Sequence, residues 1–72
     1  MPLTLIVNGE TRVLDPAPEH ASLAAVVALL AKNPQLVVTE HNGVIAPRSR
    51  WDSIVVKNDD TLEIVTIVGG GS

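Results

Sequence analysis

Alternating apolar and polar positions at the start of the chain predict a hairpin. In residues 3–7 the side chains of Leu3, Leu5 and Val7 recur with a period of two, which predicts a strand with at least one buried face. Asn8-Gly9 follows, and both residues accept the positive φ that a tight type I′ turn requires. Residues 10–14 are therefore expected to form the return strand.

The next apolar pattern has the period of a helix. Four apolar residues lie at positions i, i+3, i+4 and i+7, namely Leu23, Val26, Val27 and Leu30. Ser22 precedes them and is a good N-cap, because its hydroxyl can accept a hydrogen bond from the first turn. Asn33-Pro34 should end the helix, since proline restricts the residue before it. The pattern predicts a helix over residues 23–32, lying across a sheet.

The second half of the chain predicts several short strands separated by turns. The expected strands are residues 36–41, 44–46, 54–56 and 61–68, the third of them at a sheet edge. Asn42-Gly43 is a second tight turn, and residues 57–60 form a polar turn. The last strand is almost continuously apolar in its second half. That run indicates a central strand, covered on both faces or covered on one face with the other meeting a partner.

This order of elements predicts an α+β domain of the β-grasp (ubiquitin-like) type. We expect a mixed sheet of four to five strands, with one main helix across one face and the first and last strands parallel neighbours. The predicted domain covers residues 1–68, and residues 69–72 are predicted to be a flexible glycine tail.

The composition of the chain excludes several classes of function. The 72 residues include no cysteine, which excludes disulfides, thiolate metal sites and a cysteine nucleophile. The net charge of −3, without a basic run, argues against binding to nucleic acid or to an anionic membrane. No signal-peptide or transmembrane pattern is present, so we expect a cytoplasmic protein. His20 and His41 lie apart in the sequence, and we expect no metal, no bound cofactor and no catalytic activity.

The chain closes with Gly69-Gly70-Gly71-Ser72. Glycines lack side chains and can thread a slot that any Cβ would block, and the terminal carboxylate is the only reactive group there. This favours a tail that is presented to another protein. The same composition is also typical of a simple linker or a frayed end.

Several segments together resemble the ThiS family of ubiquitin-like sulfur carriers in thiamin (thiazole) biosynthesis. They are Val7-Asn8-Gly9-Glu10, residues 42–51 with their Pro-Arg-x-x-Trp string, Asn58-Asp59-Asp60, and residues 63–65 leading to Val68-Gly69-Gly70-Gly71. The MoaD-like molybdopterin carriers share the fold and the glycine end. They usually run longer and match residues 47–51 less well.

The resemblance implies a carrier whose tail is modified by other proteins. A ThiF-like enzyme would use ATP and Mg²⁺ to adenylate the terminal glycine, Gly71, or Gly70 if processing cuts earlier, with Gly69 and Gly70 as the flexible approach. A sulfur donor protein would convert the adenylate to a thiocarboxylate, and a ThiG-like thiazole synthase would receive the sulfur. Ser72 departs from the family pattern. Three explanations of Ser72 stay open: a protease removes it in the cell, cloning added it, or the chain in this form does not work as a carrier.

Partner contacts are expected on the last strand. Val65 and Ile67 lie on the opposite strand face from Ile64 and Thr66, and we expect them to form an exposed apolar patch beside Ile6 that docks both enzymes. Trp51 is either a buried anchor or a contact for the adenylating enzyme. Arg48 either pairs with a partner carboxylate or is simply solvated.

Three other functions stay open at this point. The chain could carry sulfur for another product, such as molybdopterin or an amino acid. It could be a protein-conjugation tag, which would give conjugates on a denaturing gel. It could also be a non-reactive interaction domain, in which case truncation after residue 68 would leave its function intact.

Overall fold

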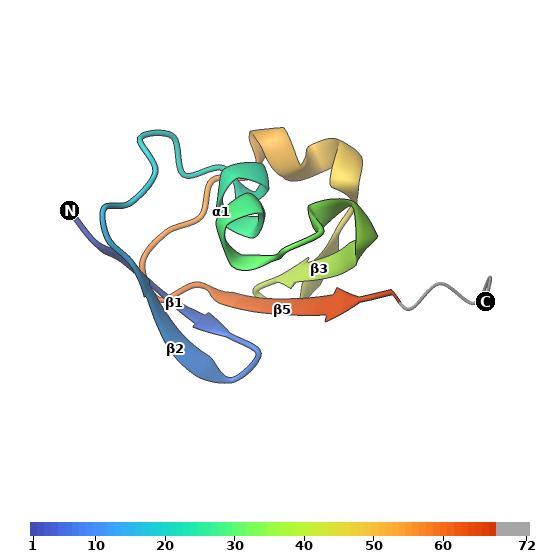
Figure 1. The fold of residues 1–72 in the computed structure, drawn as a ribbon, viewed down its shortest axis with the longest axis horizontal. Helices are drawn as coiled ribbons and strands as arrows, with labels where there is room; N and C mark the ends of the chain where they lie inside the picture. Colours follow the sequence, from blue (N-terminus) through green and yellow to red (C-terminus); the bar gives the residue numbers. More distant parts are fainter. Residues whose placement is uncertain (68–72) are drawn as a thin grey trace.

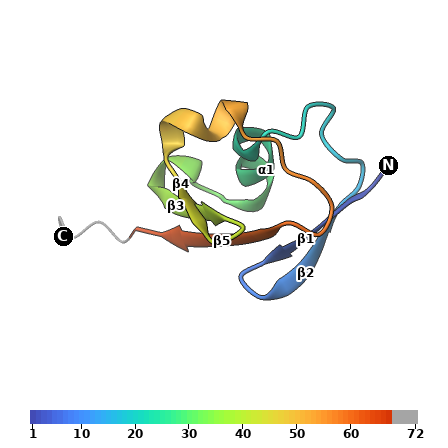
Figure 2. The same ribbon diagram turned by 180° about the vertical axis from the view of Figure 1, so that it is seen from behind.

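The computed structural model describes residues 1–67, which form a five-stranded mixed sheet with one helix packed on one face. The strand order is β2-β1-β5-β3-β4. Figures 1 and 2 show α1 above the sheet, with the opposite face of the sheet uncovered. The β-grasp prediction is confirmed, including the parallel pairing of the first and last strands.

The N-terminal hairpin has the predicted bounds. β1 (Leu3–Val7) pairs antiparallel with β2 (Glu10–Leu14), so that Val7 lies opposite Glu10. The turn residues Asn8 and Gly9 have φ values of 51° and 81°. Positive φ at both positions is what a type I′ turn needs, which is why Asn-Gly fixes this register.

The helix begins where predicted and ends two residues early. α1 (Leu23–Leu30) is capped by Ser22, whose hydroxyl accepts a hydrogen bond from the backbone N–H of Ala25 at 3.1 Å. Ala31 is already extended, although its N–H still bonds the carbonyl of Val27. The residue before Pro34 is restricted to extended conformations. This requirement favours a helix that ends before Lys32.

The segment after the helix contains two short 3₁₀ helices that the sequence pattern does not predict. η1 (Pro34–Leu36) precedes β3 (Val37–His41), and η2 (Arg48–Ser53) follows β4 (Val44–Ala46). The Asn42-Gly43 turn joins β3 to β4, with φ values of 51° and 83°. Leu36 therefore belongs to η1 and not to the strand in which it was predicted.

The prediction of an edge strand over residues 54–56 is wrong. The carbonyl of Ile54 accepts from the N–H of Leu23, and the N–H of Val56 donates to the carbonyl of Ala21, both at 2.8 Å. This segment therefore bonds to the start of α1, with only an isolated bridge between Ser22 and Val55. Both sheet edges belong to β2 and β4.

The last strand lies at the centre of the sheet. β5 (Thr61–Thr66) runs parallel to β1 and antiparallel to β3, with Val65 opposite Val38 and Glu63 opposite Glu40. Its Leu62 is completely buried against α1 and the other core residues. Ile67 follows the strand, whereas Val68, the last residue of the predicted strand, and the predicted tail 69–72 lie outside the described residues.

The hydrophobic core fills the space between the sheet and α1. Its fully buried apolar side chains are Leu5, Leu23, Val26, Val27 and Leu62. Trp51 of η2 closes one side of this core. Within residues 1–67, no helix is long and apolar enough to cross a membrane.

Candidate functional site

The end of β5 is held firmly on both sides, and this end leads into the glycine segment. On one side the Asn8 side chain accepts a hydrogen bond from the N–H of Ile64 at 2.8 Å and donates to its carbonyl at 3.1 Å. On the other side β3 pairs with β5 as far as Thr66, and the N–H of Ile67 donates to the carbonyl of Leu36 at 2.6 Å. The direction of the backbone is thus fixed up to residue 67.

The Asn8 side chain makes the hydrogen bonds to β5 that a longer β1 would make with its backbone. β1 pairs with β5 only as far as Val7 opposite Leu62, and the chain then turns away. The Asn8 carboxamide presents one acceptor and one donor to Ile64, as the backbone of a continuing strand would. The sequence predicts only a turn at Asn8. Its hydrogen bonds to β5 join residues that are 56 positions apart, and local patterns do not show such contacts.

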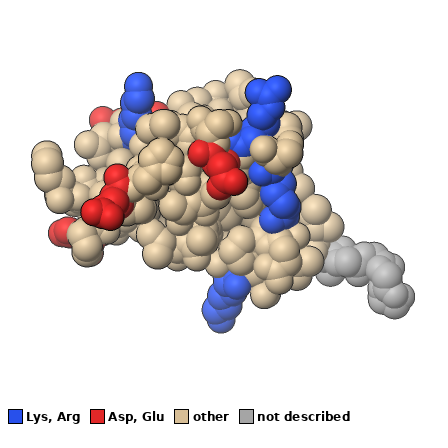
Figure 3. Space-filling model, turned by 90° about the horizontal axis from the view of Figure 1, so that it is seen from above, with Lys and Arg blue, Asp and Glu red and all other residues tan. Residues whose placement is uncertain are grey.

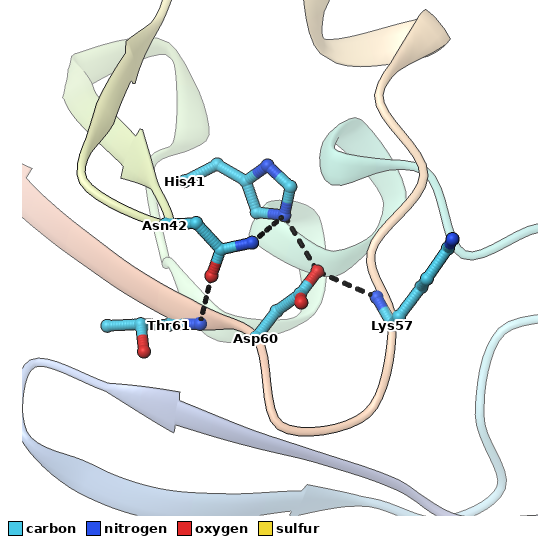
Figure 4. A network of polar contacts seen from close by, with 5 residues as sticks. All are labelled: His41, Asn42, Lys57, Asp60 and Thr61. Carbon is cyan, nitrogen blue, oxygen red and sulfur yellow. Dashed lines mark hydrogen bonds and ion pairs between the residues drawn. The ribbon is translucent and has the colours of Figure 1, made fainter.

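A polar network holds the start of β5 (Figure 4). His41 Nε2 lies 2.7 Å from Asp60 Oδ2, which also accepts from the N–H of Lys57 at 2.9 Å. Asn42 Oδ1 accepts from the N–H of Thr61 at 2.8 Å. A contact of 2.7 Å to a carboxylate requires a proton on Nε2, so the imidazole donates to Asp60. The network joins the β3–β4 turn to the turn before β5.

This network lowers the pKa of Asp60. Partial burial alone would raise it, but the hydrogen bonds from His41, from the Lys57 amide and from Asn42 stabilise the carboxylate and outweigh the burial. From the sequence alone we expect no role for His41 and only a polar turn over residues 57–60. The structure shows them together as a clamp for the central strand.

A shallow pocket of about 250 Å³ lies beside the end of β5. It brings together three of the residues singled out in the sequence, namely Ile67, Trp51 and Arg48. Val38 and Ile45 also line the pocket, together with Val37, Ala46 and Pro47. Ile67, the last residue that the structure describes, therefore lies beside an open apolar depression.

Trp51 and Arg48 form the structural support of this pocket. Trp51 is 5% exposed and its indole N–H donates to the carbonyl of Ala46 at 2.8 Å, which supports the interpretation as a buried anchor. The Arg48 guanidinium lies 4.8 Å from the indole centroid and donates to the carbonyls of Pro34 and Val37 at 2.8 and 3.4 Å. Little of Trp51 is left for direct contact with a partner.

The uncovered face of the sheet carries the exposed apolar residues expected near the end of β5. Val65 is 60% exposed and Ile67 is 52% exposed. Their neighbour is Val38, directly opposite Val65 and 41% exposed, and not Ile6 as expected. Ile6 lies on the same face but pairs with Thr61, four residues or about 13 Å before Val65 along the strand.

Val38 and Ile45 are surface residues that the sequence interpretation missed. The strand period of two gives a signal only once one residue of β3 is placed, because Val37 and Thr39 are buried and Val38 between them then faces outward. Placing Val38 beside Val65 also requires the register between β3 and β5, which the sequence alone does not supply. We use the name open face for the uncovered side of the sheet around Val38, Ile45, Val65 and Ile67.

Charged side chains are distributed unevenly over the molecule. On the side of the helix, Figure 3 shows basic side chains mainly towards the end where β5 ends and acidic side chains towards the other end. Among the described residues no group of His, Asp and Glu is placed to hold a metal ion. The predicted reactive residues Gly69, Gly70 and Gly71 lie outside residues 1–67.

Comparison with known proteins gives consistent matches along the chain. A crystal structure of the thiamine biosynthesis protein ThiS from Geobacter metallireducens superposes with a TM-score of 0.79 and 31% identity, covering 96% of this chain and 100% of that one. A thiazole synthase from Paramagnetospirillum magneticum is 33% identical over 70 residues, which is 97% of this chain and 21% of the synthase.

A shorter match is found with an uncharacterized protein, ycf40, from Trieres chinensis. The identity is 49% over 39 residues, covering 54% of this chain and 53% of that protein. This chain thus spans about half of one of these curated relatives and about a fifth of the other.

The family-level comparison covers nearly the whole sequence. The sequence model of the ThiS family matches residues 5–71, from the first buried strand to the last glycine. The match therefore includes both the strand that the Asn8 and Asp60 contacts hold and the glycine segment that follows it. The fold, the structural neighbour and this match agree, and the chain belongs to the ThiS family.

Proposed function

We propose that this protein is a sulfur carrier for the thiazole branch of thiamin biosynthesis, with Gly71 as the residue that carries sulfur. The observation that supports this most directly is the family match through Gly71, together with the likeness to a thiamine biosynthesis protein. In this proposal the domain itself supplies no catalytic group. It supplies a folded body that other proteins bind in order to position the glycine segment.

The proposed chemistry has two steps on the Gly71 carboxylate, freed by removal of Ser72. A carboxylate oxygen attacks the α-phosphorus of ATP in a ThiF-like enzyme with Mg²⁺, and pyrophosphate leaves. A sulfide equivalent from a donor protein then attacks the acyl carbon, and AMP leaves to give a thiocarboxylate. Adenylation is needed because a carboxylate oxygen is a poor leaving group, whereas AMP is a good one.

A thiazole synthase is the proposed acceptor of the sulfur. The relative from Paramagnetospirillum magneticum supports this, because a chain named thiazole synthase contains a segment that matches 97% of this protein. A carrier segment and a synthase in one chain are permanently at high effective concentration, which is useful when the two act in succession.

The open face is the proposed docking surface for these enzymes. Its apolar side chains lie next to the end of β5, so a protein that covers them is also placed beside the emerging glycine segment. Binding energy obtained there, remote from the reacting carbon, would orient Gly71 in the partner's active site. Isolated exposed apolar residues are common, but four in one place favour an interface.

The intact mass of the chain, expressed together with its ThiF-like enzyme and sulfur donor, tests this proposal. We expect a species that ends at Gly71 and has one carboxylate oxygen replaced by sulfur. A variant truncated after residue 68 serves as the control, since it has the folded domain but no glycine. If the full chain stays unmodified with active enzyme and ATP present, or appears as conjugates on lysines, the proposal is wrong.

A further inference from the structure

Two glutamates face each other in the middle of the open face. Glu40 of β3 lies directly opposite Glu63 of β5 in the antiparallel register. Residues that face each other in this way have Cβ atoms about 5 Å apart and point to the same side of the sheet. Both carboxylates therefore project from the open face, next to the Val38–Val65 pair.

This arrangement is unfavourable for the isolated domain. Like charges directly opposite each other on neighbouring strands destabilise a sheet. The five Lys and Arg residues of the chain all lie within the described part, where the only ion pair is His41 with Asp60. Neither glutamate side chain has a hydrogen-bond partner within residues 1–67.

The apolar surroundings make the pair a recognition element and not an ordinary solvated charge. Ile45 lies directly opposite Glu40 on β4, so the row across the sheet reads Ile45, Glu40, Glu63. The next row towards the end of β5 contains Val38 and Val65. Any protein that covers these exposed apolar side chains must also cover the two carboxylates, which then need a cation because a buried unpaired charge is very costly.

We infer that the open face binds a thiazole synthase surface that presents an arginine to Glu40 and Glu63, with apolar side chains around it. This inference rests on the proposed function and adds the chemistry of the partner. A guanidinium has five N–H donors in one plane and can donate to two carboxylates at once. The aliphatic stem of the arginine can also pack against apolar side chains such as Val38, Val65 and Ile45.

A second copy of this chain is a poor occupant of the same face. The chain carries a net charge of −3, and two copies packed face to face would bring four carboxylates together. The apolar residues alone would permit such a dimer, but the glutamates oppose it. The same pair thus favours one class of partner and disfavours self-association.

The test compares the binding of the synthase from the same organism to the wild type and to the double variant E40Q/E63Q. The variant keeps the shape of both side chains and removes both charges. We expect a Kd weakened on the order of tenfold or more and a weaker dependence of Kd on salt. Resistance to urea should be equal or higher, because the like-charge repulsion is gone.

The matched control is the double variant E10Q/E19Q, which removes the same net charge from exposed positions away from the open face. Its Kd should change by less than about threefold, since only long-range attraction is affected. An unchanged Kd for E40Q/E63Q, or equal weakening in both double variants, would overturn the inference. Lower urea resistance of E40Q/E63Q together with weaker binding would also overturn it, because it would indicate a structural role.

A charge exchange then locates the arginine. Glu63→Arg should abolish most of the binding, and replacement of one synthase arginine by glutamate should restore it in this variant. If no arginine restores binding, the inferred partner chemistry is wrong. The proposed function fails separately, when no thiocarboxylate forms on Gly71 or when the wild-type chain does not bind the synthase at all. The second result would remove the inference as well.

Discussion

Leu62 and Val65 lie on the same strand, three residues apart, and face opposite surroundings. Leu62 has no exposed surface and packs beneath α1, whereas Val65 is 60% exposed on the open face. Both are aliphatic residues of the kind that normally enter a core. The two faces of β5 therefore differ, since one holds the domain together and the other is exposed and is the surface that we propose for docking.

The largest effect on stability is expected from a substitution on the face of β5 that packs against the core. Leu62→Ala should lower the free energy of unfolding by about 2 to 5 kcal/mol, because it removes a fully buried side chain and leaves a cavity. Urea unfolding followed by circular dichroism measures this loss. Val65→Ala is the matched control and should change stability by less than about 0.5 kcal/mol. Equal losses in the two variants would show that the open face also stabilises the fold.

A smaller loss of stability is expected when the side-chain hydrogen bonds that hold the end of β5 are removed. Asn8→Gly keeps the positive φ and removes both hydrogen bonds to Ile64, which should cost about 1 to 2 kcal/mol. Asn42→Gly is the matched control, because that turn has the same φ and its side chain accepts from only one backbone N–H of β5. Native-state hydrogen exchange at Ile64 should accelerate in the first variant only.

A substitution on the open face is expected to lower the affinity for the proposed partners and to leave stability unchanged. Ile67→Asp should weaken the complexes with the adenylating enzyme and with the synthase by about tenfold each, which is about 1.4 kcal/mol. The free energy of unfolding should stay within about 0.5 kcal/mol of the wild type, since the side chain is 52% exposed. Isothermal titration with each partner checks this, and unchanged affinity for both would remove the open face as a docking surface.

The smallest effect concerns the clamp at the start of β5. The pKa of Asp60 is lower in the folded state than in the unfolded chain, so the folded state binds its proton less readily. Its contribution is complete above the unfolded pKa and is lost as the pH falls through the folded value. Asp60→Asn should therefore reduce stability by about 1 kcal/mol or less at pH 6, and the difference in stability should shrink as the pH falls below the unfolded pKa. A difference that does not shrink on acidification would contradict this.

Local patterns in the sequence were sufficient for the parts of the fold that depend on neighbouring residues. Both Asn-Gly turns, the Ser22 cap and the central position of the last strand are as predicted. Each depends on φ preferences, capping chemistry or a long apolar run. The end of α1 was misplaced by two residues because Ala31 and Lys32 suit a helix, while the constraint comes from Pro34 further along.

The errors concern contacts between distant segments. Residues 54–56 have the composition of a strand, but their hydrogen-bond partners are at the start of α1 and not in the sheet. Ile6 and Val65 were expected side by side because they share a face, whereas the parallel register places them far apart along β5. The Glu40–Glu63 pair likewise depends on the register of β3 with β5.

The strand order has a consequence for the synthesis of the protein. β5 is made after the other four strands of this sheet and lies at its centre, so without it the chain offers only the β1–β2 and β3–β4 hairpins. Isolated two-stranded hairpins are at best marginally stable in water. The ribosome must therefore have passed Thr66 before the domain can fold, and the glycine codons follow almost immediately. An incomplete chain that lacks β5 is thus an unfolded chain, exposed to proteolysis and unable to occupy the proposed partner enzymes unproductively.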